Sequence, residues 1–244
     1  MKNVKWGQHF LVNSHIAEKM VQRFLPVKGP ILEIGPGKGI LTRQLIKYCQ
    51  DNKITVVELD RSLCDHLENR FNENLDIFCQ NILHLHPGGL FPGEHVRVNV
   101  IGNVPYYISK ELMDWVIAHH QKIKKGMFMM QKEFVDKLMA REEAKWANAR
   151  AVLFNGLFAV EKLFDVQPGS FSPPPKVKSS VFLFEGISSP PGNDIDSGDF
   201  YAFLQRCFHS RRKTLLNNLA AAGLLPGDIK KLKAMFDNRR IPLK

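Results

Sequence analysis

Four consecutive residues are suited to acting on an aromatic amine: Asn103, Val104, Pro105 and Tyr106. An exocyclic purine amine is a poor nucleophile, because its lone pair is delocalised into the ring. The Asn103 side-chain oxygen and the Val104 carbonyl can accept its two N–H groups, which localises the lone pair on nitrogen. Pro105 holds the turn that points this carbonyl inward, and Tyr106 offers a stacking face. The motif therefore predicts a site that modifies the amino group of a planar ring.

A glycine-rich turn and an acidic residue predict that a cofactor binds next to the Asn103 motif. Gly35, Gly37 and Gly39 lie between a strand-like segment and a helix-like one, where a ligand can approach the backbone closely. Glu58 ends the next strand-like segment and can accept hydrogen bonds from both hydroxyls of a ribose. These residues fit a dinucleotide or S-adenosylmethionine, and a Walker phosphate loop is excluded because Lys38 is not followed by Ser or Thr. The Asn103 motif favours S-adenosylmethionine, whose positively charged sulfonium needs alignment rather than a strong base.

Segments in which apolar residues have the spacing of a strand alternate with segments that have the spacing of a helix along the first three quarters of the chain. Strands are predicted at 31–34, 54–59, 75–78, 96–101, 127–130 and 179–184, and helices at 16–25, from about 40 to 46, at 61–71 and at 109–119. This alternation indicates an α/β, Rossmann-like fold with a mostly parallel sheet. The proline-rich loop 171–175 leads into 179–184, which is expected to close an antiparallel edge hairpin.

The positive charge is concentrated near the C-terminus. Ten of the Lys and Arg residues and two Asp residues fall in 201–244, so this segment carries eight of the ten net positive charges. We expect a methyltransferase domain over 1–187, a linker over 188–198 and a small basic α-helical RNA-binding domain over 199–244. Arg211, Arg212 and Lys213 are the predicted phosphate contacts.

Composition and cysteine usage indicate an intracellular globular protein. Hydrophobic residues make up 44% and charged residues 24% of the sequence, no apolar run reaches membrane-spanning length, and the first residues lack the apolar core of a secretory signal. The four cysteines are scattered, which predicts reduced thiols in a cytoplasm, with Cys64 and Cys79 as small packing residues. No metal site is expected.

Several motifs in order resemble the KsgA-type rRNA adenine dimethyltransferases over nearly the whole chain. They are Gly7-Gln8-His9-Phe10-Leu11, Glu33-Ile34-Gly35-Pro36-Gly37, Glu58-Leu59-Asp60, Asn103 through Ser109, Met130-Gln131-Lys132-Glu133, Phe171 through Val177, and Arg211-Arg212-Lys213-Thr214-Leu215. The resemblance implies transfer of two methyl groups from S-adenosylmethionine to N6 of each of two adjacent adenosines near the 3′ end of small-subunit rRNA. It also implies a monomeric cytoplasmic enzyme acting on a pre-ribosomal particle, with no membrane or metal partner.

The resemblance assigns roles by position. Tyr106 and Phe171 would enclose a flipped adenine, because N6 cannot be reached in a stacked base. The implied cofactor contacts are Gln8, His9, Leu11, Gly35, Gly37, Glu58, Leu59, Asn81, Ile82 and Asn103.

Three departures from the family pattern stand out. The family usually has Asn where His9 stands and Asp where Asn81 stands, although an Asn oxygen can still accept a hydrogen bond from the cofactor's adenine. The sequence also ends before the final helix that the family usually has, which leaves the size of the RNA-binding domain open.

Other functions compatible with the sequence remain open. A large-subunit rRNA adenine methyltransferase of the Erm antibiotic-resistance type shares the fold and a similar motif, although Gly35-Pro36-Gly37 and the Arg211 motif favour the small-subunit enzyme. A DNA adenine methyltransferase is disfavoured because no target-recognition domain is apparent. A non-catalytic RNA-binding assembly factor or mitochondrial transcription factor is the alternative of another class, against which the intact Asn103 motif argues.

Overall fold

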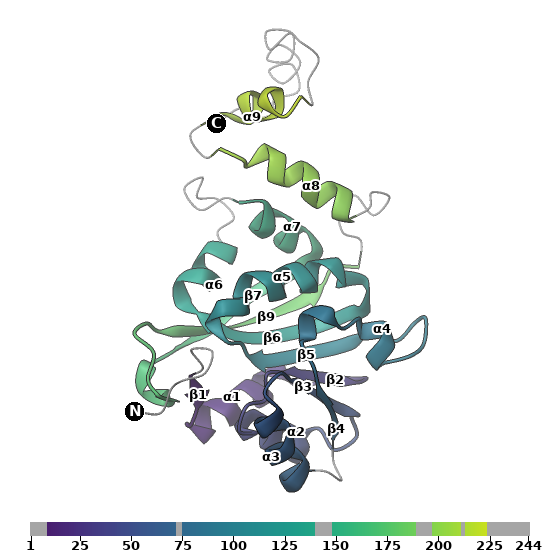
Figure 1. Ribbon diagram of the computed structural model, residues 1–244, viewed down its shortest axis with the longest axis vertical. Helices are drawn as coiled ribbons and strands as arrows, with labels where there is room; N and C mark the ends of the chain where they lie inside the picture. The colour runs from purple at the N-terminus through teal and green to yellow at the C-terminus, as the bar shows by residue number, and fades with distance from the viewer. Residues whose placement is uncertain (1–8, 72–74, 140–147, 189–196, 211–212, 224–244) are drawn as a thin grey trace.

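The computed structural model is built on a seven-stranded sheet, and it describes residues 9–71, 75–139, 148–188, 197–210 and 213–223 (Figure 1). The strands are β1 (Phe10–Leu11), β2 (Ile31–Ile34), β3 (Ile54–Glu58), β4 (Asp76–Cys79), β5 (Val98–Asn103), β6 (Ile123–Gln131), β7 (Phe158–Val166), β8 (Phe171–Ser172) and β9 (Ser179–Gly186). The α-helices are α1 (Ser14–Phe24), α2 (Ile40–Tyr48), α3 (Arg61–Phe71), α4 (Pro87–Leu90), α5 (Ser109–Ala118), α6 (Lys132–Met139), α7 (Ala149–Leu157), α8 (Ser197–Cys207) and α9 (Leu215–Ala221). Short 3₁₀ turns are η3 (Ile82–His84), η4 (Tyr106–Ile108), η5 (His120–Lys122) and η6 (Pro168–Ser170).

The large sheet has the strand order β4-β3-β2-β5-β6-β9-β7. The first five strands in this order are parallel, and β9 pairs antiparallel with both β6 and the edge strand β7. The chain reverses direction across the sheet between β2 and β5, where ligands bind in open α/β sheets. The predicted mostly parallel sheet with an antiparallel edge hairpin is therefore confirmed.

Helices cover both faces of the sheet, which explains why its central strands are apolar on both sides. One hydrophobic core combines the sheet with α1, α2 and α3, and the other combines it with α5, α6, α7 and Leu204 of α8. Figure 1 shows these two helix layers on opposite sides of the strands. All residues of β2 and β3 are buried, including Glu33 and Glu58.

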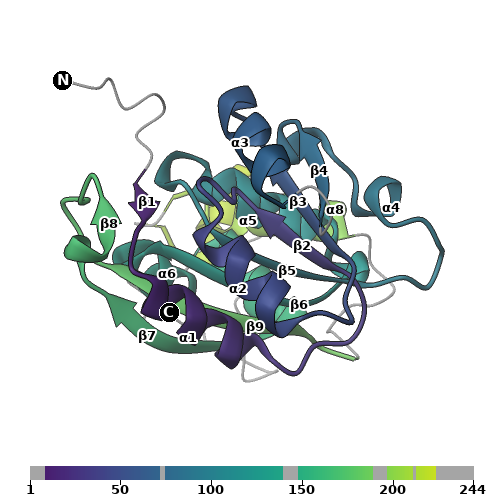
Figure 2. The ribbon, with the colours of Figure 1, turned by 90° about the horizontal axis from the view of Figure 1, so that it is seen from below.

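A separate two-stranded pairing joins the N-terminal segment to the proline-rich loop. β1 pairs antiparallel with β8, with Phe10 opposite Ser172 and Leu11 opposite Phe171. Figure 2 shows β1 and β8 side by side at one end of the large sheet. Directly after β1, the Asn13 side chain caps α1 by accepting hydrogen bonds from the backbone N–H groups of His15 and Ile16. The cap and the pairing together fix the positions of Phe10 and Leu11.

Most predicted elements lie within a few residues of the observed ones, but the sequence reading missed several. The strand expected at 127–130 is longer and begins at Ile123, and the strand expected at 96–101 continues through Asn103. α6, α7, β7 and the β1–β8 pairing were not predicted. β7, which was not predicted, is the strand that pairs with β9 to form the expected hairpin.

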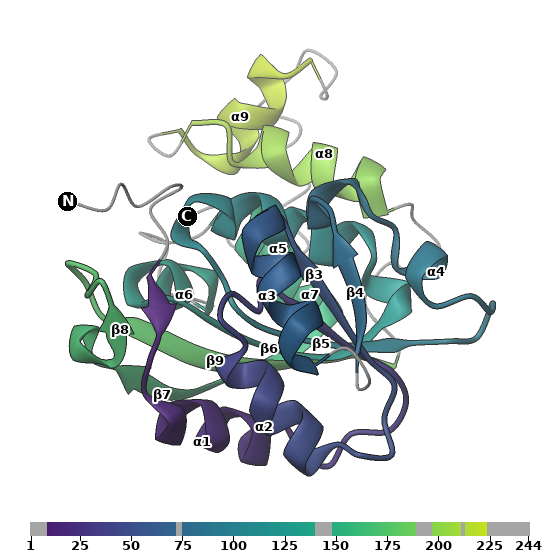
Figure 3. The same ribbon diagram turned by 60° about the horizontal axis from the view of Figure 1, so that its bottom comes forward.

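The helices after the predicted linker lie on the side of the sheet covered by α5 and α7 (Figures 1 and 3). Leu204 of α8 is buried in the same hydrophobic core as residues of α5 and α7. α8 begins at Ser197, inside the segment expected to be a linker. The division into domains at 187 and 198 remains a prediction.

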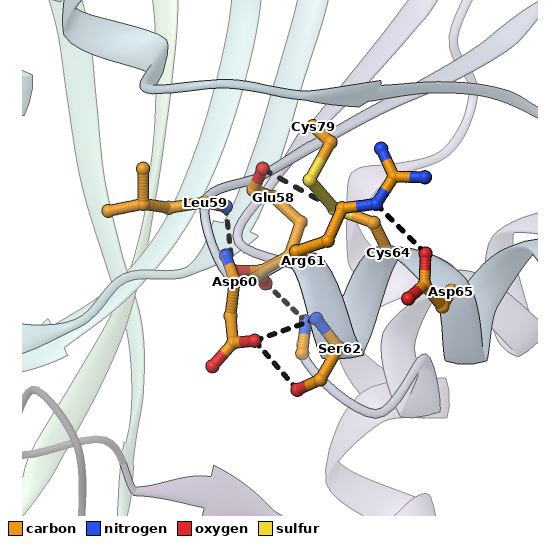
Figure 4. Close-up of a disulfide and its surroundings, with 9 residues drawn as sticks. Glu58, Leu59, Asp60, Arg61, Ser62, Cys64, Asp65 and Cys79 are labelled. Atoms are coloured by element: carbon orange, nitrogen blue, oxygen red, sulfur yellow. Dashed lines mark hydrogen bonds and ion pairs between the residues drawn. A yellow bond between two sulfur atoms is a disulfide. The ribbon is translucent and has the colours of Figure 1, made fainter.

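The expectation that all four cysteines are free is wrong. Cys64 of α3 and Cys79 of β4 form a disulfide, whereas Cys49 and Cys207 are free and buried (Figure 4). The packing of α3 beside β4 brings the two Cα atoms to 5.9 Å, a separation that permits the bond. Spacing along the sequence does not reveal this proximity, so scattered cysteines do not support the argument for a reducing compartment.

Candidate active site

A cavity of about 320 Å³ opens at the carboxyl ends of β2, β3 and β5. It is lined by every described residue among the predicted catalytic residues and cofactor contacts, from motifs that are far apart in the sequence. They are His9, Leu11, Gly35, Gly37, Glu58, Leu59, Asn81, Ile82, Asn103, Val104, Pro105, Tyr106 and Phe171. Gly39 of the glycine turn does not line it and packs against Phe71 and Leu67. Gln8 lies outside the described residues. The fold therefore gathers the predicted site into one cavity, while the roles of these residues remain predictions.

The glycine turn and Glu58 form one hydrogen-bonded unit on the cavity wall. Gly35 and Gly37 have φ values of +66° and +56°, which side chains disfavour. The Gly37 N–H donates to Glu58 Oε2 at 3.1 Å, and the N–H groups of Leu59 and Asp60 donate to Glu58 Oε1 at 2.8 and 3.1 Å. A carboxylate accepts about four hydrogen bonds, so Glu58 keeps capacity for a ligand hydroxyl.

Glu33 is a second carboxyl on the same wall, and the sequence analysis assigned it no role of its own. It lines the cavity, is only 1% exposed, and its Oε2 has no hydrogen-bond partner among the described residues. Burial, with a smaller contribution from the negative charge of Glu58, raises the pKa of Glu33 to about 8. The available signal was an acidic residue inside the otherwise apolar strand Ile31–Ile34.

Asn103 is held by the N-terminal segment. Its side-chain Nδ2 donates to the backbone carbonyl of His9 at 3.3 Å, which orients the amide and leaves Oδ1 as the acceptor end. The next residue is tied to the sheet, because the Val104 N–H donates to the Met129 carbonyl at 3.1 Å. The amide of a cavity-lining residue at the end of β5 is therefore held in one orientation.

Tyr106 lies on η4. Its hydroxyl is 2.8 Å from the Ser179 hydroxyl, and its ring centroid is 5.6 Å from that of His9. Burial raises the pKa of the half-buried Tyr106 hydroxyl above its ordinary value, and the hydrogen bond with Ser179 opposes this shift. Sequence reasoning did not identify Ser179 as part of the site.

The proline-rich loop contributes Phe171 to the cavity wall. Phe171 is 4% exposed and is held by its pairing with Leu11. His9 Nδ1 lies 2.7 Å from the Pro173 carbonyl, so the His9 imidazole joins the N-terminal segment to this loop. The His9 side chain thus lies between Tyr106 and the proline-rich loop. The cofactor contact that the resemblance implies for His9 remains a prediction.

Asn81 is a further residue of the cavity wall. Its Oδ1 caps η3 by accepting a hydrogen bond from the Leu83 N–H at 3.0 Å, and Ile82 packs into the core next to it. One lone pair of Oδ1 and the amide NH₂ remain for a ligand. The disulfide of Cys79 anchors the strand that leads into this loop, close to Glu58 (Figure 4).

The donors and acceptors of the cavity fit S-adenosylmethionine. The unpartnered Glu33 oxygen suits a cationic or N–H-bearing group, and the remaining Glu58 lone pair suits a ribose hydroxyl. The glycine turn leaves backbone exposed toward the same space.

Lys213, the predicted phosphate contact that the structure describes, does not line this cavity. Lys213 is exposed in the segment between α8 and α9, and Arg211 and Arg212 lie outside the described residues. No described helix is long and apolar enough to cross a membrane. Within the described ranges, no cluster of three or more His, Cys, Asp or Glu side chains is arranged to hold a metal ion.

The fold is that of the Rossmann-like methyltransferases. The chain superposes on a dimethyladenosine transferase from Plasmodium falciparum with a TM-score of 0.76 and 22% identity, covering 97% of this chain and 91% of that one. It superposes on the 23S rRNA methyltransferase ErmE with a TM-score of 0.71 and 20% identity, covering 96% and 91%. At these identities the likeness concerns the fold alone.

Sequence comparison identifies the family. Residues 1–236 match the model of the ribosomal RNA adenine dimethylase family, and the chain belongs to that family. It is 37% identical to the ribosomal RNA small subunit methyltransferase A of Prochlorococcus marinus, covering 96% of this chain and 86% of the relative. It is 34% identical to the protein of the same name from Acidobacterium capsulatum, covering 92% and 80%.

Proposed function

We propose that this chain transfers methyl groups from S-adenosylmethionine to N6 of two adjacent adenosines near the 3′ end of small-subunit rRNA, as part of ribosome biogenesis. The observation that carries the proposal is the Asn103 amide, which donates through Nδ2 to the His9 carbonyl and lines the same cavity as Glu58 and the glycine turn. The names of the relatives from P. marinus and A. capsulatum support the small subunit as the substrate.

On the cofactor side, bound S-adenosylmethionine supplies a methyl group on a positively charged sulfur. Glu58 accepts a ribose hydroxyl, and Asn81 with Ile82 contacts the adenine ring. Glu33 accepts a hydrogen bond from a donor of the methionine portion with its unpartnered oxygen. Leu11, Leu59 and the two glycines Gly35 and Gly37 close around the ligand, and His9 contributes through its backbone.

On the acceptor side, the target adenine leaves its stack and enters between Tyr106 and Phe171. Asn103 Oδ1 and the Val104 carbonyl accept the two N–H groups of the N6 amine, and Pro105 keeps that carbonyl in place. The hydrogen bond to the His9 carbonyl prevents the Asn103 amide from turning its NH₂ toward the amine, where two donors would face each other. Because the N6 lone pair is then aligned with the methyl group of the cofactor, the transfer needs no strong base.

Outside the base pocket, we propose that the protein binds rRNA by electrostatic attraction. Arg211, Arg212 and Lys213 in the basic C-terminal segment bind rRNA phosphates, as neutralisation of phosphates dominates nucleic-acid affinity. In this proposal the protein acts as a monomer in the cytoplasm on a pre-ribosomal particle.

Methyl transfer from labelled S-adenosylmethionine tests the substrate. We expect labelling of unmethylated small ribosomal subunits, with little on large subunits, naked rRNA or duplex DNA. Labelling confined to large subunits would instead assign the Erm type of activity, and RNA binding without any labelling would assign a scaffold role. Either result would overturn the proposal.

A further inference from the structure

Ser179 carries a buried hydroxyl that contacts Tyr106, a residue of the proposed base pocket, from the sheet. It is the first residue of β9, lies between Gln131 of β6 and Val166 of β7, and is 0% exposed. Its Oγ is 2.8 Å from the Tyr106 hydroxyl, which is the contact between the antiparallel edge hairpin and the Asn103 motif. Because Ser179 is paired with a strand on each side, its hydroxyl is a fixed partner for the Tyr106 hydroxyl.

Tyr106 needs such a restraint if a base is to stack on it. It sits on η4, a single 3₁₀ turn with no side-chain cap, so little in its local backbone fixes the plane of the ring. A phenylalanine would offer the same stacking face, and therefore the hydroxyl must serve another purpose than stacking. A ring held in its productive orientation before the substrate arrives saves the free energy of ordering it during binding.

The structure restrains the same ring a second time. The His9 imidazole lies against it at 5.6 Å between centroids with an interplanar angle of 40°. His9 is in turn held by the Pro173 carbonyl, 2.7 Å from its Nδ1. Tyr106 is thus restrained at its hydroxyl by the sheet and beside its ring by the N-terminal segment.

We propose that Ser179 is a positioning residue for methyl transfer, whose hydroxyl fixes the Tyr106 ring in the plane on which the target adenine stacks. This inference rests on the proposed function, because it concerns the geometry of the acceptor base. Ser179 touches neither the cofactor nor the substrate and acts through Tyr106 alone.

The adjacent residue offers a matched control. Ser180 is also 0% exposed on β9, and its hydroxyl donates a 2.6 Å hydrogen bond to Asp165 Oδ1. Side chains of neighbouring strand residues point to opposite faces, so Ser180 does not share the contact with Tyr106. Ser180→Ala therefore removes a buried hydroxyl and one hydrogen bond from the same strand without changing the proposed pocket.

The experiment compares Ser179→Ala, Ser180→Ala, Tyr106→Phe and the double variant Ser179→Ala/Tyr106→Phe on unmethylated small subunits. We expect Ser179→Ala and Tyr106→Phe each to lower kcat about 10-fold, a barrier change of about 1.4 kcal/mol, with KM for S-adenosylmethionine within about twofold of wild type. The double variant should be no slower than either single variant, because both remove the same hydrogen bond. Ser180→Ala should keep kcat within about twofold.

Three results would overturn the positioning role of Ser179 while leaving the proposed function standing. One is a kcat for Ser179→Ala equal to that of Ser180→Ala, and another is an additive loss of about 100-fold in the double variant. Tyr106→Phe leaves the sheet untouched, so full activity in this variant would be decisive even if Ser179→Ala failed to fold. Wild-type protein that methylates no small subunits would instead overturn the proposed function, and the positioning role with it, so the two failures are distinguishable.

Discussion

Glu33 shows how one residue can link the apolar core to the cofactor half of the site. It sits within a strand buried on both faces, yet its carboxyl group borders the cavity with one oxygen unpartnered. A charged carboxylate there lacks solvation, and for that reason burial raises its pKa to about 8. The cost of burying this group is compatible with a role in binding a cationic ligand.

The raised pKa of Glu33 predicts an unusual dependence of stability on pH. Between the ordinary pKa of 4.5 and about 8, the folded protein holds a proton that the unfolded chain releases. The contribution of Glu33 to the free energy of unfolding is therefore complete below about pH 4.5 and is lost as pH rises toward 8.

Glu33→Gln should remove this contribution. Relative to wild type, the variant should gain at least about 1 kcal/mol in unfolding free energy between pH 5.5 and 8.5, since one pKa unit corresponds to about 1.4 kcal/mol. Urea denaturation of both proteins at the two pH values measures the difference. Parallel pH profiles for the two proteins would show that Glu33 titrates normally.

At the scale of elements, close packing of β5 against β2 sets the position of Asn103. A Cβ on Gly102 would lie 2.4 Å from the Ile34 carbonyl oxygen, so any side chain there must push the two strands apart. Gly156 of α7 has nothing within 4 Å of its would-be Cβ and is the matched glycine.

Gly102→Ala should lower the free energy of unfolding by about 1–3 kcal/mol through overpacking, and should lower methyl transfer because Asn103 shifts with β5. Gly156→Ala should be neutral or stabilising by up to about 1 kcal/mol, since alanine favours the helix. Chemical denaturation of both variants measures these changes. Equal stability of the two variants would contradict the tight contact between the strands.

The disulfide between α3 and β4 leads to a separate prediction. Because Cys64 and Cys79 are bonded and Cys49 and Cys207 are free, the denatured, unreduced protein should show two reactive thiols, and four after reduction. Thiol titration in guanidinium chloride measures both numbers. Four thiols before any reductant is added would mean that the disulfide does not form.

Helices and strands with a regular pattern of apolar residues could be predicted from the sequence. Strands that form only by pairing with a distant part of the chain could not. Residues 31–34 read as a strand because a continuous apolar run precedes the glycine turn. β7 contains Glu161, Lys162 and Asp165, which hide its strand character, and becomes a strand through pairing with β9. Its charges are accommodated at the sheet edge, where Lys162 Nζ lies 2.8 Å from Asp136 and 3.0 Å from Asp165.

At the scale of the whole molecule, the same distinction applies to the candidate site. Residues within one motif, such as Asn103 and Tyr106, could be assigned from chemistry and order along the chain. The contacts of Asn103 with the His9 carbonyl and of Tyr106 with Ser179 span 94 and 73 residues, and only the folded chain brings them together. The sequence therefore supplies the hypothesis of which groups act, and the structure adds which groups hold Asn103 and Tyr106 in place.

The most direct measurement of the central claim is nucleoside analysis of small-subunit rRNA after incubation with the protein and S-adenosylmethionine. Mass spectrometry of the digested RNA should detect N6,N6-dimethyladenosine with wild-type protein and none with Asn103→Ala, which should still bind the subunit within a few-fold of wild type. N6,N6-dimethyladenosine formed by Asn103→Ala at the wild-type level, or methylation of a different atom by the wild-type protein, would contradict the account.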